Sequence, residues 1–134
     1  MRRSCIASLI ASASSFVLVT SAMARPYFEQ VLANPNRIAP DLLARSGRTP
    51  AIVGVAGQMV IDDGRRRVEV HEMTGSVHAQ GFQLVWLPRE RLLIEADAFT
   101  PAPPGTPPPA VANANNLNLV ANIERLRLDV DRIL

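Results

Sequence analysis

The stretch Gly75–Pro101, with the sequence GSVHAQGFQLVWLPRERLLIEADAFTP, decides the fold of this chain. It contains two apolar runs, Phe82–Leu87 and Leu92–Ala96, on either side of the short polar run Pro88–Arg91. Apolar runs of this length, separated by a few turn-forming residues, are typical of a β-hairpin whose strands are buried on one or both faces. We therefore predict that this hairpin forms the core.

Two chemically reactive side chains border the predicted hairpin. His78 lies in the glycine-rich loop before the first strand, and Asp97 ends the second strand. Antiparallel neighbours bring the start of one strand beside the end of the other, so we expect both side chains at the same edge of the sheet. Imidazole nitrogen and carboxylate oxygen both bind metals. His78 and Asp97 are therefore the candidate metal-binding residues.

The same residues resemble the second half of the metallo-β-lactamase-fold hydrolases. The resemblance is carried by Gly75–Gly81 around the histidine, by Leu87–Asp97 and by Thr100–Pro101, and it extends forward to Leu134 and backward to about Val17. It implies an α+β fold of the αββα type. This chain would form part of such a sandwich, with a mixed β-sheet and flanking helices.

The resemblance also implies a zinc-dependent hydrolase with an incomplete metal site. His78 matches the third metal-binding element of the family, and Asp97 matches the fourth, an aspartate that commonly bridges two zinc ions. The sequence contains no His-X-His-X-Asp-His motif, and it ends at Leu134, before the position expected for the last histidine. The implied protein is a truncated or split hydrolase without an assigned catalytic residue, with weak or absent zinc binding and no activity by itself.

An incomplete sandwich would also need partners. Half of a sandwich leaves a sheet edge and an apolar face uncovered, which favours pairing with a missing N-terminal fragment or self-association. The alternative reading is a small exported β-rich binding module without catalysis. In that case His78 is a loop histidine and Asp97 a polar strand end.

Composition places limits on the function. The chain has 134 residues, 48% of them hydrophobic, which indicates one globular domain at most. The formal net charge is only +2, so there is no strong electrostatic case for nucleic-acid binding. The one cysteine, Cys5, excludes an internal disulfide and a cysteine-based zinc site.

Residues 1–24 resemble a secretory signal. Met1–Arg3 is a basic start, Ile6–Val19 an apolar centre, and Ser21–Ala24 a run of small residues before a cleavage point. This pattern predicts a periplasmic or secreted protein with a mature domain at 25–134. The apolar segment is too short and too rich in serine for a membrane-spanning helix.

A competing interpretation applies to the same segment. Phe16–Ser21 can be a buried strand of the hydrolase fold, followed by a helix that begins near Arg25, which is how the resembling family runs. Residues up to about 15 would then come from a displaced start, and the protein would be cytoplasmic. Both interpretations cannot hold for one molecule.

A second hairpin is expected before the histidine loop. Gln58–Asp62 and Arg67–Met73 read as strands joined at Asp63–Gly64, a dipeptide that favours a type I′ turn. His71 is then a strand residue. We expect it to be exposed or hydrogen-bonded, and not a metal ligand.

Helices are expected on both sides of the strands. Pro26–Ala33 and Pro40–Arg45 read as short surface helices. Asn113–Arg127 is the strongest helix pattern, and Asp129–Leu134 a closing strand. In the helix Asn113–Arg127, the residues predicted to form the buried stripe are Leu117, Leu119, Val120, Ile123 and Leu126.

Overall fold

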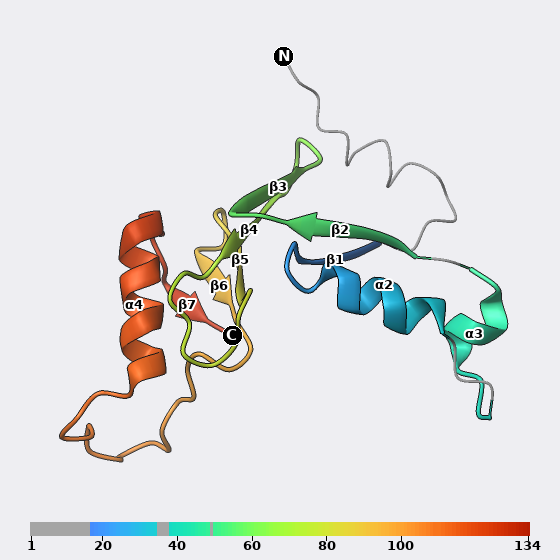
Figure 1. The fold of residues 1–134 in the computed structure, drawn as a ribbon. Coiled ribbons are helices and arrows are strands. Elements are labelled where there is room, and N and C mark those ends of the chain that lie inside the picture. Colours follow the sequence, from blue (N-terminus) through green and yellow to red (C-terminus); the bar gives the residue numbers. More distant parts are fainter. Residues whose placement is uncertain (1–16, 35–37, 49) are drawn as a thin grey trace.

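A computed structural model describes residues 17–34, 38–48 and 50–134. Strands and helices are mixed in an α+β arrangement, with a two-stranded sheet, a five-stranded mixed sheet and a few helices (Figure 1). The expected mixed sheet with flanking helices is confirmed at this level. Within the described residues, no helix is both long and apolar enough to cross a membrane.

The N-terminal part is a strand, helix, strand unit. Strand β1 (Val17–Ser21) pairs in parallel with β2 (Ala51–Val55), and helices α2 (Arg25–Ala33) and α3 (Leu42–Ser46) lie between them in the chain. Parallel neighbours need such a crossover connection. Residues 17–21 therefore form a strand in the structure, as the fold-strand interpretation expects. The earlier part of the signal-like segment lies outside the described residues.

Both predicted hairpins are present in the larger sheet, whose order is β3-β4-β5-β6-β7. The antiparallel strands are β3 (Gln58–Asp62), β4 (Arg67–Glu72), β5 (Gln83–Leu87) and β6 (Leu92–Ile94). The sheet closes with β7 (Arg132–Ile133), which runs parallel to β6.

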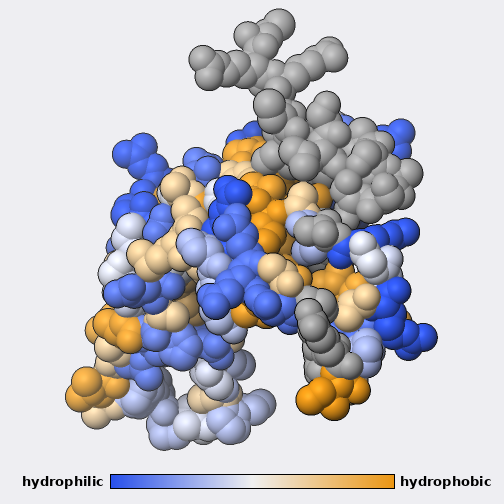
Figure 2. All heavy atoms as spheres, turned by 45° about the vertical axis from the view of Figure 1, so that its right-hand side comes forward, coloured by the Kyte–Doolittle hydropathy of each residue, from blue (hydrophilic) through white to orange (hydrophobic). Residues whose placement is uncertain are grey.

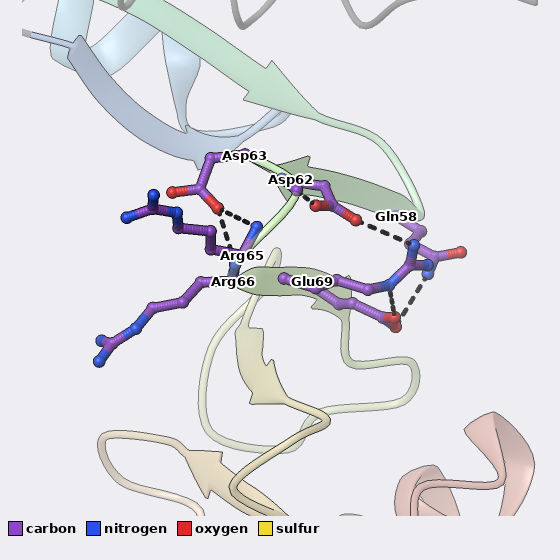
Figure 3. A network of polar contacts seen from close by, with 8 residues as sticks. Gln58, Asp62, Asp63, Arg65, Arg66 and Glu69 are labelled. Atoms are coloured by element: carbon purple, nitrogen blue, oxygen red, sulfur yellow. Dashed lines mark hydrogen bonds and ion pairs between the residues drawn. The ribbon is translucent and has the colours of Figure 1, made fainter.

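The prediction of a type I′ turn between β3 and β4 is wrong. Asp62 pairs with Arg67, which leaves a four-residue turn from Asp63 to Arg66. Gly64 has a φ of 84° and is the one residue of this turn with positive φ, whereas a type I′ turn needs two. The longer turn is stabilised by side-chain acceptors, as Figure 3 shows.

The aspartates of this turn bind its backbone. Asp63 Oδ1 accepts hydrogen bonds from the N–H groups of Arg65 and Arg66, at 2.8 and 2.7 Å. These N–H groups, that of Arg66 first, hold the pKa of Asp63 below its ordinary range. After the turn, Glu69 Oε1 accepts a hydrogen bond from Arg67 Nε at 2.6 Å, and both residues lie in β4. Of the three consecutive arginines, Arg67 also forms an ion pair with Asp62, at 3.8 Å.

The core lies between the larger sheet and helix α4 (Ala114–Leu126). Its buried members are Met73, Leu84, Trp86, Leu93, Ala98 and Leu119. Leu84 and Leu93 are fully buried, and each lies in a strand of the predicted central hairpin. That hairpin therefore forms the core, as the sequence predicts.

The predicted apolar stripe of α4 is only partly right. Leu119 is buried and Ile123 and Leu126 pack against the core, but Leu117 and Val120 are 58% and 51% exposed. Asn122, which is 2% exposed, takes an inward position beside Leu119 instead. The helix is rotated so that this polar residue faces the sheet, because it binds the chain that follows β4.

Two strand ends also differ from expectation. The predicted strand Leu92–Ala96 ends at Ile94, so Asp97 lies in the bend after β6 instead of in the strand. The closing strand covers residues 132 and 133 and not the whole of Asp129–Leu134. Asp97 is therefore positioned by a turn.

The β1–β2 side keeps several apolar side chains exposed. Figure 2 brings this side forward and shows apolar residues among the hydrophilic surface. Met23, Tyr27 and Val31 are 60%, 63% and 45% exposed, and helix α2 has no buried residue within its described span.

Candidate functional site

The two candidate ligands lie together. His78 Nε2 is 3.5 Å from Asp97 Oδ2, and the two side chains are 46% and 65% exposed. The loop before β5 and the bend after β6 therefore place an imidazole and a carboxylate side by side, where solvent reaches both.

Short-range contacts fix the histidine loop. Ser76 Oγ accepts hydrogen bonds from the N–H groups of His78 and Ala79, at 3.3 and 3.2 Å. The imidazole meets the ring of Phe82 edge-on, with ring centroids 6.2 Å apart and an interplanar angle of 78°. The backbone and one side of the ring are thus held in place, while the Nε2 side faces Asp97.

The start of this loop is tied to helix α4. Asn122 Oδ1 accepts from the Thr74 N–H at 2.9 Å, and Asn122 Nδ2 donates to the Thr74 carbonyl at 2.9 Å. Asn118 Nδ2 donates to the same carbonyl at 3.0 Å. Because Asn122 is buried, its two bonds to Thr74 are largely shielded from water and position the residues that lead to His78.

The end of the loop is tied to β1. Gly81 has a φ of 69°, and a Cβ atom built on it would lie 2.5 Å from Ser21 Oγ. Only glycine tolerates both the positive φ and this close approach. The loop therefore packs directly against the C-terminal end of the smaller sheet.

Asp97 is presented by a carboxylate-stabilised turn. Glu95 accepts hydrogen bonds from the N–H groups of Ala98 and Phe99, at 2.6 and 3.2 Å. Ala98 is 2% exposed and anchors the bend in the core. Since the backbone is fixed on the C-terminal side of Asp97, its carboxylate projects outward from a rigid support.

One hollow borders Asp97. It is polar, has a volume of about 100 Å³, and is lined by Asp97, Thr100 and three asparagines at the start of α4, Asn113, Asn115 and Asn116. A second, open hollow of about 280 Å³ lies between Val19–Ser21 of β1, Gln80–Gln83 and Ala96, and neither His78 nor Asp97 lines it.

The donor set has a clear limit. In the part of the chain that the structure describes, no three His, Cys, Asp or Glu side chains are grouped so that they could hold a metal ion. A zinc site normally uses three or four protein ligands. His78 and Asp97 provide two donors, which is an incomplete set.

His71 belongs to a different environment. It is 4% exposed, and its Nε2 lies 3.0 Å from Glu69 Oε2 on the same strand. The expectation of a hydrogen-bonded strand histidine is confirmed. Its Nδ1 is buried without a hydrogen-bond partner in the described structure. His71 acts in packing and not at the solvent-exposed pair.

Glu69 gives an acid-dependent contribution to stability. Burial opposes ionisation of its carboxyl group, but hydrogen bonds from Arg67 and then His71 outweigh burial, and the pKa of Glu69 lies below its ordinary value of 4.5. A lowered folded-state pKa stabilises the protein above about pH 4.5, and this contribution is lost as the pH falls through the lower value.

We therefore expect Glu69→Gln to reduce the loss of unfolding free energy between about pH 5 and pH 3, measured by urea unfolding. Glu90→Gln, in the turn between β5 and β6, is the matched control and should keep the original pH dependence. Equal pH dependence in wild type and Glu69→Gln would contradict the assignment.

In comparisons with known proteins, no family model, no curated protein and no solved structure matches the chain.

Sequence reasoning missed the Asn122–Thr74 contact that supports the site. One signal was available, because Asn122 stands three residues after Leu119 and four before Leu126, on the inward side of the helix. A polar residue within an apolar helical stripe requires a buried partner. The sequence does not identify that partner.

Proposed function

We propose that this chain is the later half of a zinc-dependent hydrolase of the metallo-β-lactamase fold, truncated or split, and inactive by itself. The observation that carries the proposal is the 3.5 Å separation between His78 Nε2 and Asp97 Oδ2. The sequence resemblance assigns metal-binding roles to the same two residues.

The geometry of the pair fits zinc as part of a ligand set. Nitrogen and oxygen ligands lie about 2.0 to 2.2 Å from zinc, so two of them around a tetrahedral ion are about 3.4 Å apart. The distance between His78 Nε2 and Asp97 Oδ2 is close to that separation. The missing ligands would come from the upstream motif and the last histidine of the family.

The residues of this chain have distinct roles in the proposed site. Zinc supplies Lewis acidity and lowers the pKa of a bound water toward about 7. His78 would provide a nitrogen ligand through Nε2 and is oriented by the Ser76 turn and the Phe82 ring. Asp97 would provide a carboxylate ligand. Both residues would hold the metal, and neither is proposed to attack the substrate.

The architecture supports the same proposal at a coarser level. A two-stranded sheet and a five-stranded sheet, with helices α2 and α4 beside them, are compatible with part of an αββα sandwich (Figure 1). On this proposal Val17–Ser21 is a strand of the fold, and the protein is cytoplasmic.

The alternative is a small exported binding module without catalysis. The incomplete donor set favours it, because two exposed ligands bind zinc weakly. A mature chain that begins near Arg25, detected by mass spectrometry, would support export and would remove β1 from the folded protein. An intact N-terminus in the cytoplasm supports the hydrolase proposal.

The decisive experiment adds the two metal-binding segments that, on this proposal, the chain lacks. The purified chain should show at most weak zinc binding, measured by calorimetry, and no hydrolysis of a β-lactam, thioester or lactone panel. Co-expression with an upstream fragment that carries His-X-His-X-Asp-His, with the terminal histidine segment restored, should raise both zinc content and hydrolysis. Strong zinc binding by the unsupplemented chain would contradict the proposal.

A further inference from the structure

The hollow that borders Asp97 has polar walls beside the candidate metal pair. Of its six lining residues, only Ala98 has an apolar side chain. Asp97 Oδ2 also lies 3.5 Å from His78 Nε2, so a group in this hollow lies next to the pair. We propose, on the basis of the proposed hydrolase function, that the hollow binds the part of the substrate beside the bond that is hydrolysed. This part is an uncharged group that both donates and accepts hydrogen bonds, such as an amide.

Three polar side chains of the hollow are available to such a group. Across the residues that the structure describes, the side chains of Thr100, Asn115 and Asn116 form no hydrogen bond. Asn115 and Asn116 are nevertheless half-buried, so water satisfies them only in part. A hydroxyl and a carboxamide each donate and accept hydrogen bonds. A ligand group with the same ability therefore matches these walls.

The charge of the walls decides against an anion. Asp97 is the one charged residue among the six that line the hollow. The start of α4 carries a partial positive charge of about +0.5, and the Asp97 carboxylate already supplies the negative charge that this favours. A second anion in the hollow would meet no lysine or arginine among the lining residues and would be repelled by Asp97. An uncharged group avoids this cost.

The backbone at the helix start contributes less than the side chains. Asn113 Oδ1 accepts a hydrogen bond from the Asn115 N–H at 2.8 Å, so this N–H is satisfied within the helix. Free N–H groups at a helix start are the usual binding groups for anions. The cap therefore leaves recognition mainly to the amides of Asn115 and Asn116.

The hollow is small and its walls are held in place. Its volume of about 100 Å³ is a few times the roughly 30 Å³ that a water molecule occupies, which is room for a group of a few heavy atoms. One wall is fixed by the Asn113 cap, and the other by Ala98, which is 2% exposed and whose N–H donates to Glu95 at 2.6 Å. Preformed walls lower the entropic cost of binding.

Acetamide and acetate provide a matched test, because they have nearly the same size and shape and differ in charge. Each is titrated into the full 134-residue chain at neutral pH with a chelator present, and the side-chain NH₂ signals of Asn113, Asn115 and Asn116 are followed by NMR. Acetamide should shift these signals saturably. Acetate should bind at least roughly fivefold more weakly, which is the factor for two like charges about 4 Å apart in water.

Three variants separate the contributions. Asn116→Ala should weaken acetamide binding by roughly fivefold, because it removes one hydrogen-bonding side chain from the wall. Asn34→Ala, at the end of α2, is the matched control and should leave binding unchanged. Thr100→Lys places a cation in the wall at an exposed position and should reverse the preference, so that acetate binds more tightly than acetamide.

No binding of acetamide, or equal binding of acetamide and acetate by the unmodified chain, would overturn the proposal. Equal losses in Asn116→Ala and Asn34→Ala would also overturn it. The measurement needs neither zinc nor hydrolysis, so its failure differs from failure of the hydrolase function. Hydrolysis by the supplemented protein without acetamide binding would remove only this substrate class, whereas acetamide binding by a chain that complementation never activates would remove the hydrolase function.

Discussion

Asn122→Ala should lower the free energy of unfolding by about 2 to 4 kcal/mol, one of the largest effects expected for a single polar residue here. The Asn122 side chain is buried and exchanges hydrogen bonds with both the N–H and the carbonyl of Thr74. Alanine would leave these backbone groups without those bonds and would also open a cavity. Urea unfolding at neutral pH measures the change.

The matched control is on the same helix. Leu117→Ala removes a larger apolar side chain, but Leu117 is 58% exposed, so its cost should stay within about 0.5 kcal/mol. Hydrogen exchange provides a second measurement, because loss of Asn122 should speed exchange in residues 74–81 before the rest of the sheet. Similar costs for the two substitutions would show that Asn122 does not hold the loop.

The second large effect concerns the supplemented protein. Once the missing family segments are supplied, Asp97→Ala should abolish the gain in zinc content and hydrolysis, because it removes the proposed bridging carboxylate. In the proposed site this carboxylate would be one of the ligands that hold the metal. The measurement is metal content per protein, together with the rate on the best substrate of the panel.

The control for Asp97→Ala is a histidine outside the pair. His71→Gln preserves a polar group near Glu69 in the buried position and should leave most of the gain intact. His78→Ala should lower zinc content and hydrolysis as much as Asp97→Ala does, because it removes the Nε2 atom that faces the Asp97 carboxylate. Equal losses in Asp97→Ala and His71→Gln, with both proteins folded by circular dichroism, would show that the site is assigned wrongly.

The parts of the fold that the sequence predicts correctly depend on short-range pattern. The hairpin between β5 and β6 follows from two apolar runs around a polar turn, and its central residues Leu84 and Leu93 are fully buried. Helix α4 is capped by Asn113, whose side chain accepts a hydrogen bond from the Asn115 N–H at 2.8 Å, as the sequence predicts. Alternation and capping are local properties and can be read residue by residue.

The features that the sequence does not predict depend on contacts across long separations. The rotation of α4 is set by Asn122 and Thr74, which are 48 positions apart. The turn after β3 is set by which aspartate reaches which N–H, and an Asp-Gly dipeptide is compatible with more than one result. Periodicity identifies a helix face but not the polar partner that fixes it.

The candidate site also has features that the sequence predicts and features that it does not. The meeting of His78 and Asp97 follows from hairpin geometry, even though Asp97 lies beyond the end of β6. The support of the loop by Ser21 of β1 could not be predicted, because it joins the two sheets. Whether the pair binds zinc remains a prediction that the complementation experiment tests.

The contact between Gly81 and Ser21 creates thermodynamic linkage between two distant events. It joins the loop of His78 to β1, because the Ser21 side chain packs directly on the glycine. A ligand that binds the His78–Asp97 pair and orders this loop should therefore also stabilise β1. By reciprocity, whatever stabilises β1 would strengthen binding of that ligand by the same factor.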